Sequence, residues 1–218
     1  MKWRTASAIA LFAIAMPVAS RAEGSVEHID FSVYTPGKLP PAFGSSWRTG
    51  SGAPGDWQVI VDPTASQGKA IAQLNADPTD YRFPLAVYEP TTVQNVEVSI
   101  RFKSVAGRVD RAGGLAVRLT GPDDYYLVRA NALEDNVNFY RVVKGRRQEI
   151  KGAAVKVSSG EWHTLTLRAE GDRFTISFDS KPLFTATDKT FGSAGKIALW
   201  TKADSVTHFD QLVIRVLP

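Results

Sequence analysis

Apolar and polar residues alternate with a period of two through much of the chain. The clearest example is "EWHTLTLRAEGDRFTISFDSKPLFTATD", where Leu165 and Leu167 alternate with threonines and an arginine up to a turn at Gly171–Asp172. Beyond that turn, apolar Phe174, Ile176 and Phe178 alternate with polar residues, and a second turn leads to "PLFTATD". This pattern predicts an antiparallel meander with one face on a core.

Similar short runs recur along the chain, closed by Gly, Asp, Asn or Pro, and no segment keeps helical periodicity for three turns. The further strands we predict are "DWQVIVD", "KAIAQLN", "LAVYE", "NVEVSIRFKS", "GGLAVRLT", "YYLVRAN", "VNFYRVV", "GKIALWTK" and "THFDQLVIRV". Many strands without intervening helices are typical of an all-β, two-sheet antiparallel β-sandwich of the jelly-roll kind. The Pro/Gly-rich segment Thr35 to Pro54 is long for a loop. We interpret it as an ordered covering loop rather than a disordered linker, because it contains Phe43 and Trp47.

The first 22 residues have the layout of a secretory signal peptide. Lys2 and Arg4 precede an apolar run from Ala8 to Ala19, and Ser20-Arg21-Ala22 places small residues where a signal peptidase cleaves. The run is short for a membrane span. We therefore expect residues 1–22 to be removed and residues 23–218 to form a single β-sandwich domain, periplasmic or secreted.

Removal of that segment changes the charge balance. The chain has 26 basic and 22 acidic residues, and loss of Lys2, Arg4 and Arg21 leaves a net charge of only +1. That balance does not favour a nucleic-acid partner. The sequence contains no cysteine, so disulfides, thiol nucleophiles and thiolate metal sites are excluded.

The histidines and acids show no metal-binding pattern. His28, His163 and His208 have no spacing that would place two imidazoles on one metal ion. Asp30 and Asp210 lie near the first and last strands, but a calcium site needs six or more oxygens. We expect no obligatory metal and no cofactor.

The stretch "GGLAVRLTGPDDYYLVRAN" contains the candidate ligand-binding residues. By parity, Arg118 lies opposite Leu115, Val117 and Leu119, and Arg129 and Asn131 lie opposite Tyr126, Val128 and Ala130. The next strand, "VNFYRVV", adds Tyr140 and Asn138, although its parity is ambiguous because Phe139 and Arg141 would then share the other face, and "ALWTK" adds Trp200 and Lys202 by the same logic. The candidate set is Arg118, Arg129, Asn131, Tyr140 and Trp200. Aromatic rings stack on sugar C–H faces, and guanidinium and amide groups bond hydroxyls, so the set suits a saccharide. The alternative is that these are ordinary solvated strand residues, with Trp200 in the core.

The order of "GGLAVR", "DYYLVRAN", "NFYRVVKGRR", "EWHTLTLRAEGDRFTISFD" and "GKIALWTKADSVTHFDQLVI" resembles the concanavalin A-like jelly rolls of the 3-keto-disaccharide hydrolase family. That family is similar to family 16 glycosidases and laminin G-like modules. The resemblance covers about residues 28 to 216. It implies a two-sheet sandwich with a concave face and, in enzyme members, hydrolysis of sugars, and it places Arg118 on the arginine that follows the Gly-rich strand start.

No catalytic residues can be assigned. The ExDxxE strand of family 16 glycosidases has its nearest counterpart in Glu170-Gly171-Asp172, which lacks the second Glu and occupies a turn. Glu134 and Asp135 suit a turn cap or solvated charge better than catalysis. The residues thus favour an exported carbohydrate-active domain that binds a saccharide on its concave sheet, with hydrolysis, for example of a 3-keto-disaccharide, left open. The alternative is a non-enzymatic, laminin G-like module for a protein or envelope polymer.

Overall fold

The computed structural model describes residues 24–218, so the expected signal peptide lies outside the described residues. The described chain is built from strands and one 3₁₀ turn, η1 (Phe31–Val33). The strands are β1 (Val26–Ile29), β2 (Ser45–Gly50), β3 (Trp57–Val61), β4 (Lys69–Gln73), β5 (Arg82–Val93), β6 (Val96–Ala106), β7 (Ala112–Gly121), β8 (Asp124–Asn131), β9 (Asn136–Val143), β10 (Arg146–Ala154), β11 (Trp162–Glu170), β12 (Arg173–Phe178), β13 (Lys181–Thr187), β14 (Gly195–Trp200) and β15 (Val206–Val216). Within residues 24–218, no helix has the length and hydrophobicity needed to cross a membrane.

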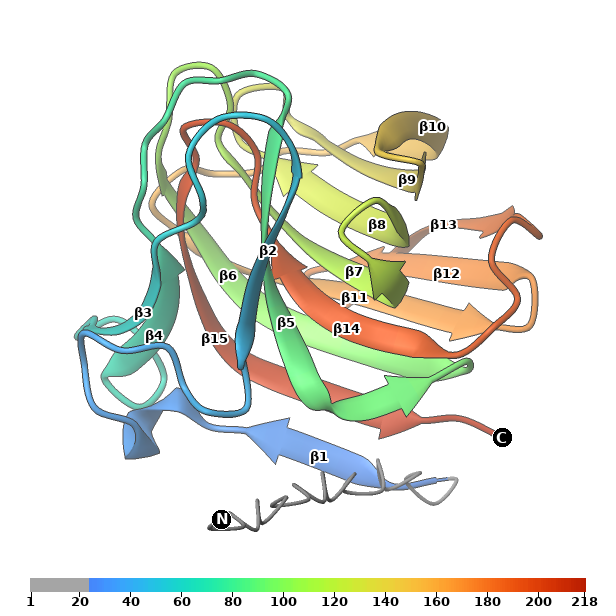
Figure 1. The fold of residues 1–218 in the computed structure, drawn as a ribbon, viewed down its shortest axis with the longest axis horizontal. Helices are drawn as coiled ribbons and strands as arrows, with labels where there is room; N and C mark the ends of the chain where they lie inside the picture. Colours follow the sequence, from blue (N-terminus) through green and yellow to red (C-terminus); the bar gives the residue numbers. More distant parts are fainter. Residues whose placement is uncertain (1–23) are drawn as a thin grey trace, which may run out of the picture.

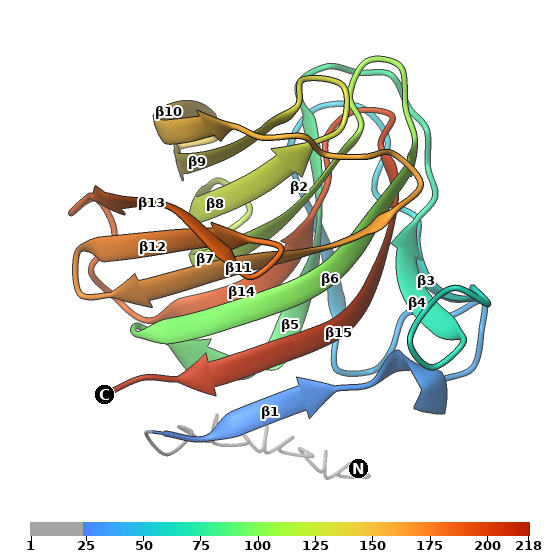
Figure 2. The ribbon, with the colours of Figure 1, turned by 180° about the vertical axis from the view of Figure 1, so that it is seen from behind.

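The strands form two antiparallel sheets packed face to face, which confirms the predicted sandwich (Figure 1). The seven-stranded sheet has the order β10-β9-β8-β7-β14-β5-β2. The eight-stranded sheet has the order β13-β12-β11-β6-β15-β4-β3, with β1 paired to β15, and is nearest the viewer in Figure 2. The last strand, β15, therefore lies inside its sheet, between β6 and β4.

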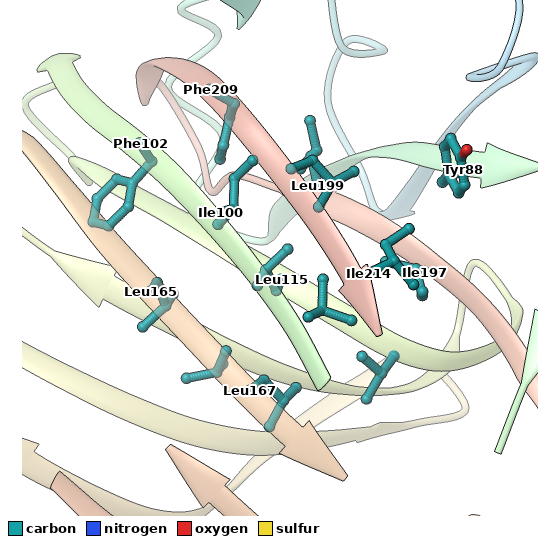
Figure 3. Close-up of a cluster of buried hydrophobic side chains, with 14 of the residues drawn as sticks. Tyr88, Ile100, Phe102, Leu115, Leu165, Leu167, Ile197, Leu199, Phe209 and Ile214 are labelled. Atoms are coloured by element: carbon teal, nitrogen blue, oxygen red, sulfur yellow. The ribbon is translucent and has the colours of Figure 1, made fainter. Parts of the chain in front are cut away.

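The main core fills the space between the two sheets. Figure 3 shows part of it: Ile100 and Phe102 of β6 and Leu165 and Leu167 of β11 come from one sheet, and Leu115 of β7 comes from the other. These side chains are fully buried. The predicted alternation in "HTLTL" and "RFTISF" is confirmed, because the apolar positions lie in this core and their polar neighbours are partly exposed.

Three strands were not predicted, and each has a local reason. Strand β1 is only four residues long and is partly exposed. Strand β10 is an edge strand of mostly polar residues. Strand β2 lies inside the Thr35–Pro54 segment, which is ordered as expected, since Phe43 is buried against the rings of Phe31 and Tyr88.

A tight turn joins β9 to β10. Lys144 and Gly145 have φ values of 50° and 74°, and two consecutive positive φ values are the signature of a type I′ hairpin turn. The Asp124 carboxylate accepts a hydrogen bond from the backbone N–H of Lys144 at 2.9 Å. The tip of the hairpin is thereby attached to the neighbouring β7–β8 turn.

The parity of β12 yields a stability prediction. Ile176→Ala removes a fully buried side chain between the sheets and should lower the free energy of unfolding by about 2–5 kcal/mol. Ser177→Ala, on the other face, should change it by about 0.5 kcal/mol or less. Urea denaturation measures both, and equal effects at the two positions would contradict the assigned parity.

Candidate functional site

The outer face of the seven-stranded sheet carries a second apolar cluster, separate from the core between the sheets. Its members alternate with core residues along each strand, because successive side chains point to opposite faces. The cluster consists of Phe83, Leu85, Val87, Ala112, Ala116, Leu119, Tyr125, Leu127, Tyr140, Val142, Ala198 and Trp200, with Trp47 packed against it. All twelve are at most 4% exposed, so this outer face is a small core of its own.

The cluster is buried because the sheet curls until its two sides meet. Thr49 of β2 donates a hydrogen bond to the carbonyl of Pro122 in the β7–β8 turn, and its hydroxyl lies 2.7 Å from that of Tyr125. Across the same face, the Tyr81 hydroxyl donates to the carbonyl of Gly145 at 2.6 Å. The described strands of this sheet thus fold around the apolar cluster and shield it from water.

Arg147 closes the curled face. Its backbone N–H donates to the Tyr81 hydroxyl at 2.9 Å. The guanidinium lies 5.0 Å from the ring centroid of Phe83, 4.7 Å from that of Tyr140 and 5.9 Å from that of Trp200. A cation over aromatic faces is attracted by the ring quadrupoles. Trp200, predicted as a ligand-binding residue, is fully buried beneath this layer.

The structure brings four of the five predicted site residues to this outer face. In register across the strands, Trp200 faces Gly114, Gly114 faces Arg129, and Arg129 faces Asn138. Tyr140 and Asn131 lie on either side of that row. The predicted parity of β8 is therefore confirmed, and the ambiguous parity of β9 is resolved with Tyr140 on the outer face and Phe139 in the core. Arg129, Asn131, Tyr140 and Trp200 are nevertheless all at most 4% exposed.

Arg118 lies elsewhere. The pairing of β7 with β8 is irregular between Val117 and Gly121, and Arg118 has a φ of 52°. A β-bulge of this kind turns a side chain to the other face. The expectation that Arg118 shares a face with Arg129 is therefore wrong, because strict alternation does not continue through the bulge.

The guanidinium of Arg118 is bonded to backbone carbonyls at one end of the sandwich. Nε donates to the carbonyl of Gln94 at 2.9 Å, Nη1 to that of Phe191 at 2.7 Å and Nη2 to that of Gly171 at 2.6 Å. The group also lies 5.3 Å from the ring centroid of Phe174. Arg118 is 1% exposed, and these contacts tie three separate loops together.

Arg129 is the centre of a polar network at one end of the outer face. Its Nη2 donates to Glu134 Oε2 at 2.6 Å and to the Tyr140 hydroxyl at 3.0 Å. Asn138 Nδ2 lies 3.0 Å from the same hydroxyl and donates to Glu149 Oε2, also at 3.0 Å. Burial alone would raise the pKa of Glu134, but the hydrogen bonds from Arg129 and Asn136 hold it below its ordinary value.

A second set of charges adjoins the first through Asp110. Asn131 Nδ2 donates to Asp110 Oδ1 at 3.0 Å, and Lys202 Nζ lies 3.1 Å from Asp110 Oδ2 and 2.5 Å from Asp80 Oδ1. Arg129 Nη1 is 3.9 Å from Asp110 Oδ1. Burial raises the pKa of the Asp110 carboxyl, against the opposing effects of Arg129 and Lys202.

This network has a buried centre and an exposed rim. Arg129 Nη1 is buried and has no hydrogen-bond partner among the described residues. The side chains of Glu134 and Asp80 are 48% and 72% exposed, and Glu149 is also exposed. The exposed carboxylates are held in fixed orientations by buried hydrogen-bond partners such as Arg129. They can therefore accept hydrogen bonds from hydroxyl groups of a ligand.

Sequence reasoning missed Asp110, Glu149, Asp80 and Arg147. Two of them lie in loops, and the other two lie in strand β10, which the pattern did not predict. Glu134 was interpreted as a turn cap or solvated charge, and it instead binds Arg129. Asp135 is a half-exposed carboxylate that pairs with Lys156 at 2.9 Å and accepts from the backbone N–H of Val157 at 3.1 Å.

Asp30 and Asp210, the two acids considered for calcium, line one hollow on the outer face of the other sheet. Asp30 caps η1 by accepting from the Ser32 backbone N–H at 2.8 Å. Asp210 accepts from the Ser66 backbone N–H at 2.8 Å and from Arg101 at 2.9 Å. In the part of the chain that the structure describes, no three His, Asp or Glu side chains come together as a possible metal site.

Solved structures with the same fold include several carbohydrate-related domains. The carbohydrate-binding module CBM66 from Bacillus subtilis superposes with a TM-score of 0.60 at 21% identity, covering 78% of this chain and 94% of that one. Domain 4 of AbnA, a GH43 extracellular arabinanase from Geobacillus stearothermophilus solved with arabinotriose, gives 0.56 at 15% identity, covering 86% and 89%. The Bacillus licheniformis β-glucanase gives 0.51 at 14% identity, covering 79% and 98%. At these identities the likeness concerns the fold.

The fold, with a polar network at one end of an otherwise apolar outer face, is that of a lectin-like jelly roll. The sequence profile described as "Galactocerebrosidase, C-terminal lectin domain" matches residues 89–217, more than half of the chain. The chain therefore belongs to this family of lectin domains. No curated protein sequence matches it.

The carbonyl contacts of Arg118 yield a second stability prediction. Arg118→Ala leaves three carbonyls without their charged donor, so the free energy of unfolding should fall by about 3 kcal/mol or more. Arg173→Ala, which removes an exposed arginine from β12, is the control and should change it by about 0.5 kcal/mol or less. Urea denaturation compares the two, and similar stabilities would remove the structural role assigned to Arg118.

Proposed function

We propose that this domain binds a saccharide at the polar end of its curled outer face. The observation that carries the proposal is the network centred on Arg129, in which a buried guanidinium and the Asn138 amide hold two carboxylates at the surface. Glu134 and Glu149 accept hydrogen bonds from ligand hydroxyls. Arg129, Asn131, Tyr140 and Trp200 act from beneath, as positioning residues, because they are at most 4% exposed.

The relatives support a saccharide as the ligand class. The matched family is one of lectin domains. Among the solved structures, CBM66 is a carbohydrate-binding module, and domain 4 of the arabinanase was solved with arabinotriose. We propose an oligosaccharide of neutral sugars for this face, since its exposed rim consists of carboxylates that accept from hydroxyls and repel anions.

Hydrolysis is the second candidate function, and 3-keto-disaccharides are its candidate substrate. It is favoured by the two carboxylates, Glu134 and Glu149, that the network holds on one face, because glycoside hydrolysis uses such a pair. The non-enzymatic alternative is a laminin G-like module that binds a protein or an envelope polymer on the same face. Incubation with glycosides and 3-keto-glycosides, followed by measurement of released reducing sugar, distinguishes turnover from binding.

We also propose that the protein is exported to the periplasm or the medium, with residues 1–22 as its signal peptide and residues 23–218 as one domain. Support comes from the order of charged, apolar and small residues in that segment. A cysteine-free chain with a buried core is compatible with an oxidising compartment.

The binding prediction concerns the exposed carboxylates. Glu134→Ala and Glu149→Ala should each weaken binding of the saccharide that a glycan array identifies by about 1.5–3 kcal/mol, the range for hydrogen bonds to charged groups. Glu161→Ala removes an exposed carboxylate from the turn before β11 and should leave affinity unchanged. Calorimetric titration measures all three. Wild-type affinity in both network variants, with thermal melts confirming folding, would exclude this face as the binding site.

The export prediction is tested by intact-mass measurement. Protein recovered from the cell envelope or medium should begin at Glu23, or within a residue or two of it, because cleavage is expected after Ala22. Recovery of the full-length chain from the cytoplasm, starting at Met1, would contradict both the compartment and the proposed domain boundary.

A further inference from the structure

The β9–β10 hairpin concentrates positive charge that the rest of the chain does not have. Between residues 141 and 151 it carries five cations and one carboxylate, although the chain beyond the expected signal peptide is almost neutral. The pairing of the two strands sorts these cations onto two faces. Arg147 pairs with Val142 and faces the curled outer surface, while Arg146 pairs with Val143 on the opposite side.

That opposite side forms a hollow with a volume of ≈ 610 Å³, within the usual range for small-molecule sites. It is lined by Arg141, Val143, Lys144, Arg146, Gln148 and Thr190. Thr190 comes from the segment between β13 and β14, and β10 is tied to β13 on this side by Lys151, whose Nζ donates to the carbonyl of Thr185 at 3.0 Å. Figure 2 shows β9, β10 and β13 gathered at the same edge of the sandwich.

Hydrogen bonds hold Arg141 in place at the base of the hollow, whereas the two other cations that line it have no acidic partner within the described chain. Arg141 donates through Nε to Gln148 Oε1 at 3.0 Å and through Nη1 to Asp188 Oδ2 at 2.8 Å and Thr190 Oγ1 at 3.1 Å. Its side chain is still 38% exposed. Asp188 is already engaged, because it also accepts from the Tyr126 hydroxyl at 2.7 Å and the Thr190 backbone N–H at 2.8 Å.

Lys144 and Arg146 are the unpaired cations. Both side chains are exposed, and no carboxylate of residues 24–218 lies within ion-pair distance of either one. The nearby acid Asp124 accepts from the Lys144 backbone N–H, not from its ammonium group. Because the type I′ turn is tight, the two side chains project from fixed positions on either side of Gly145.

We propose that this hollow binds the carboxylate of an acidic sugar residue, and so forms a second saccharide site behind the face centred on Arg129. Lys144 and Arg146 meet the carboxylate, Gln148 and Thr190 hydrogen-bond ring hydroxyls, and Val143 contacts the C–H surface of the sugar. The choice of a saccharide as the carrier of the carboxylate rests on the proposed function; the choice of an anion rests on the hollow alone.

The lining also argues against other anionic partners. No aromatic side chain lines the hollow, whereas sites for single-stranded nucleic acid combine a basic groove with stacked aromatic rings. Val143 is its single apolar residue, too little for insertion into a lipid surface. Gln148 and Thr190 are neutral hydrogen-bonding groups of the kind that suit hydroxyls.

The test is calorimetric titration of the whole protein with trigalacturonate and with its fully methyl-esterified form, which keeps the sugar rings and removes the charge. The acid should bind at least about tenfold more tightly than the ester, and the difference should shrink in high salt. Lys144→Gln/Arg146→Gln should weaken trigalacturonate binding by about tenfold or more. Lys181→Gln, which removes an exposed lysine of β13, is the matched control and should bind like wild type.

Several results would overturn the inference: equal affinity for acid and ester, wild-type affinity in the folded double variant, or oligoglutamate or anionic phospholipid vesicles binding as tightly as trigalacturonate. Competition separates this site from the face centred on Arg129, because a saturating amount of the neutral saccharide that a glycan array identifies should not displace trigalacturonate. If no neutral saccharide binds but the charge-dependent results hold, the proposed function of the other face fails and the acidic site stands.

Discussion

The seven-stranded sheet is apolar on both faces, and both faces must be kept dry. The eight-stranded sheet covers the inner face. The outer face is covered by the sheet itself, which curls until Thr49 reaches the β7–β8 turn and Tyr81 reaches Gly145. Arg147 completes the cover with a guanidinium over three aromatic rings. Most of the outer face is therefore filled by its own side chains, and the carboxylates around Arg129 are what reaches solvent.

The alternation of side chains explains which parts of the site could be predicted. Arg129, Asn131, Tyr140 and Trp200 were placed on one face correctly because β8, β9 and β14 keep a strict period of two up to those residues. Arg118 was misplaced because one residue with a positive φ reverses the parity of its strand, and nothing in "AVRLT" marks the bulge. The depth at which these side chains are buried could not be predicted either. It depends on the curvature of the sheet, which brings the hydroxyls of Thr49 and Tyr125, far apart in the sequence, to within 2.7 Å of each other.

Charge is sorted by face in this molecule. Carboxylates form the exposed rim around Arg129, and cations line the hollow on the other side of the β9–β10 hairpin. The β9–β10 hairpin thus carries one cation and one carboxylate, Arg147 and Glu149, on its outer side and mainly cations on the other side, because side chains of successive residues point in opposite directions. This separation follows from strand pairing and appears only when β10, which the sequence pattern did not predict, is placed beside β9.

The position of the last strand has a consequence for how the chain acquires its structure. Strand β15 fills the space between β6 and β4 and also pairs with β1 at the start of the described chain. The eight-stranded sheet therefore cannot close until β15 has been synthesised and has paired with β6, β4 and β1. Since pairing between distant segments is slow to form, closure of this sheet is a late step in folding, and loss of β15 removes the middle of the sheet rather than its edge.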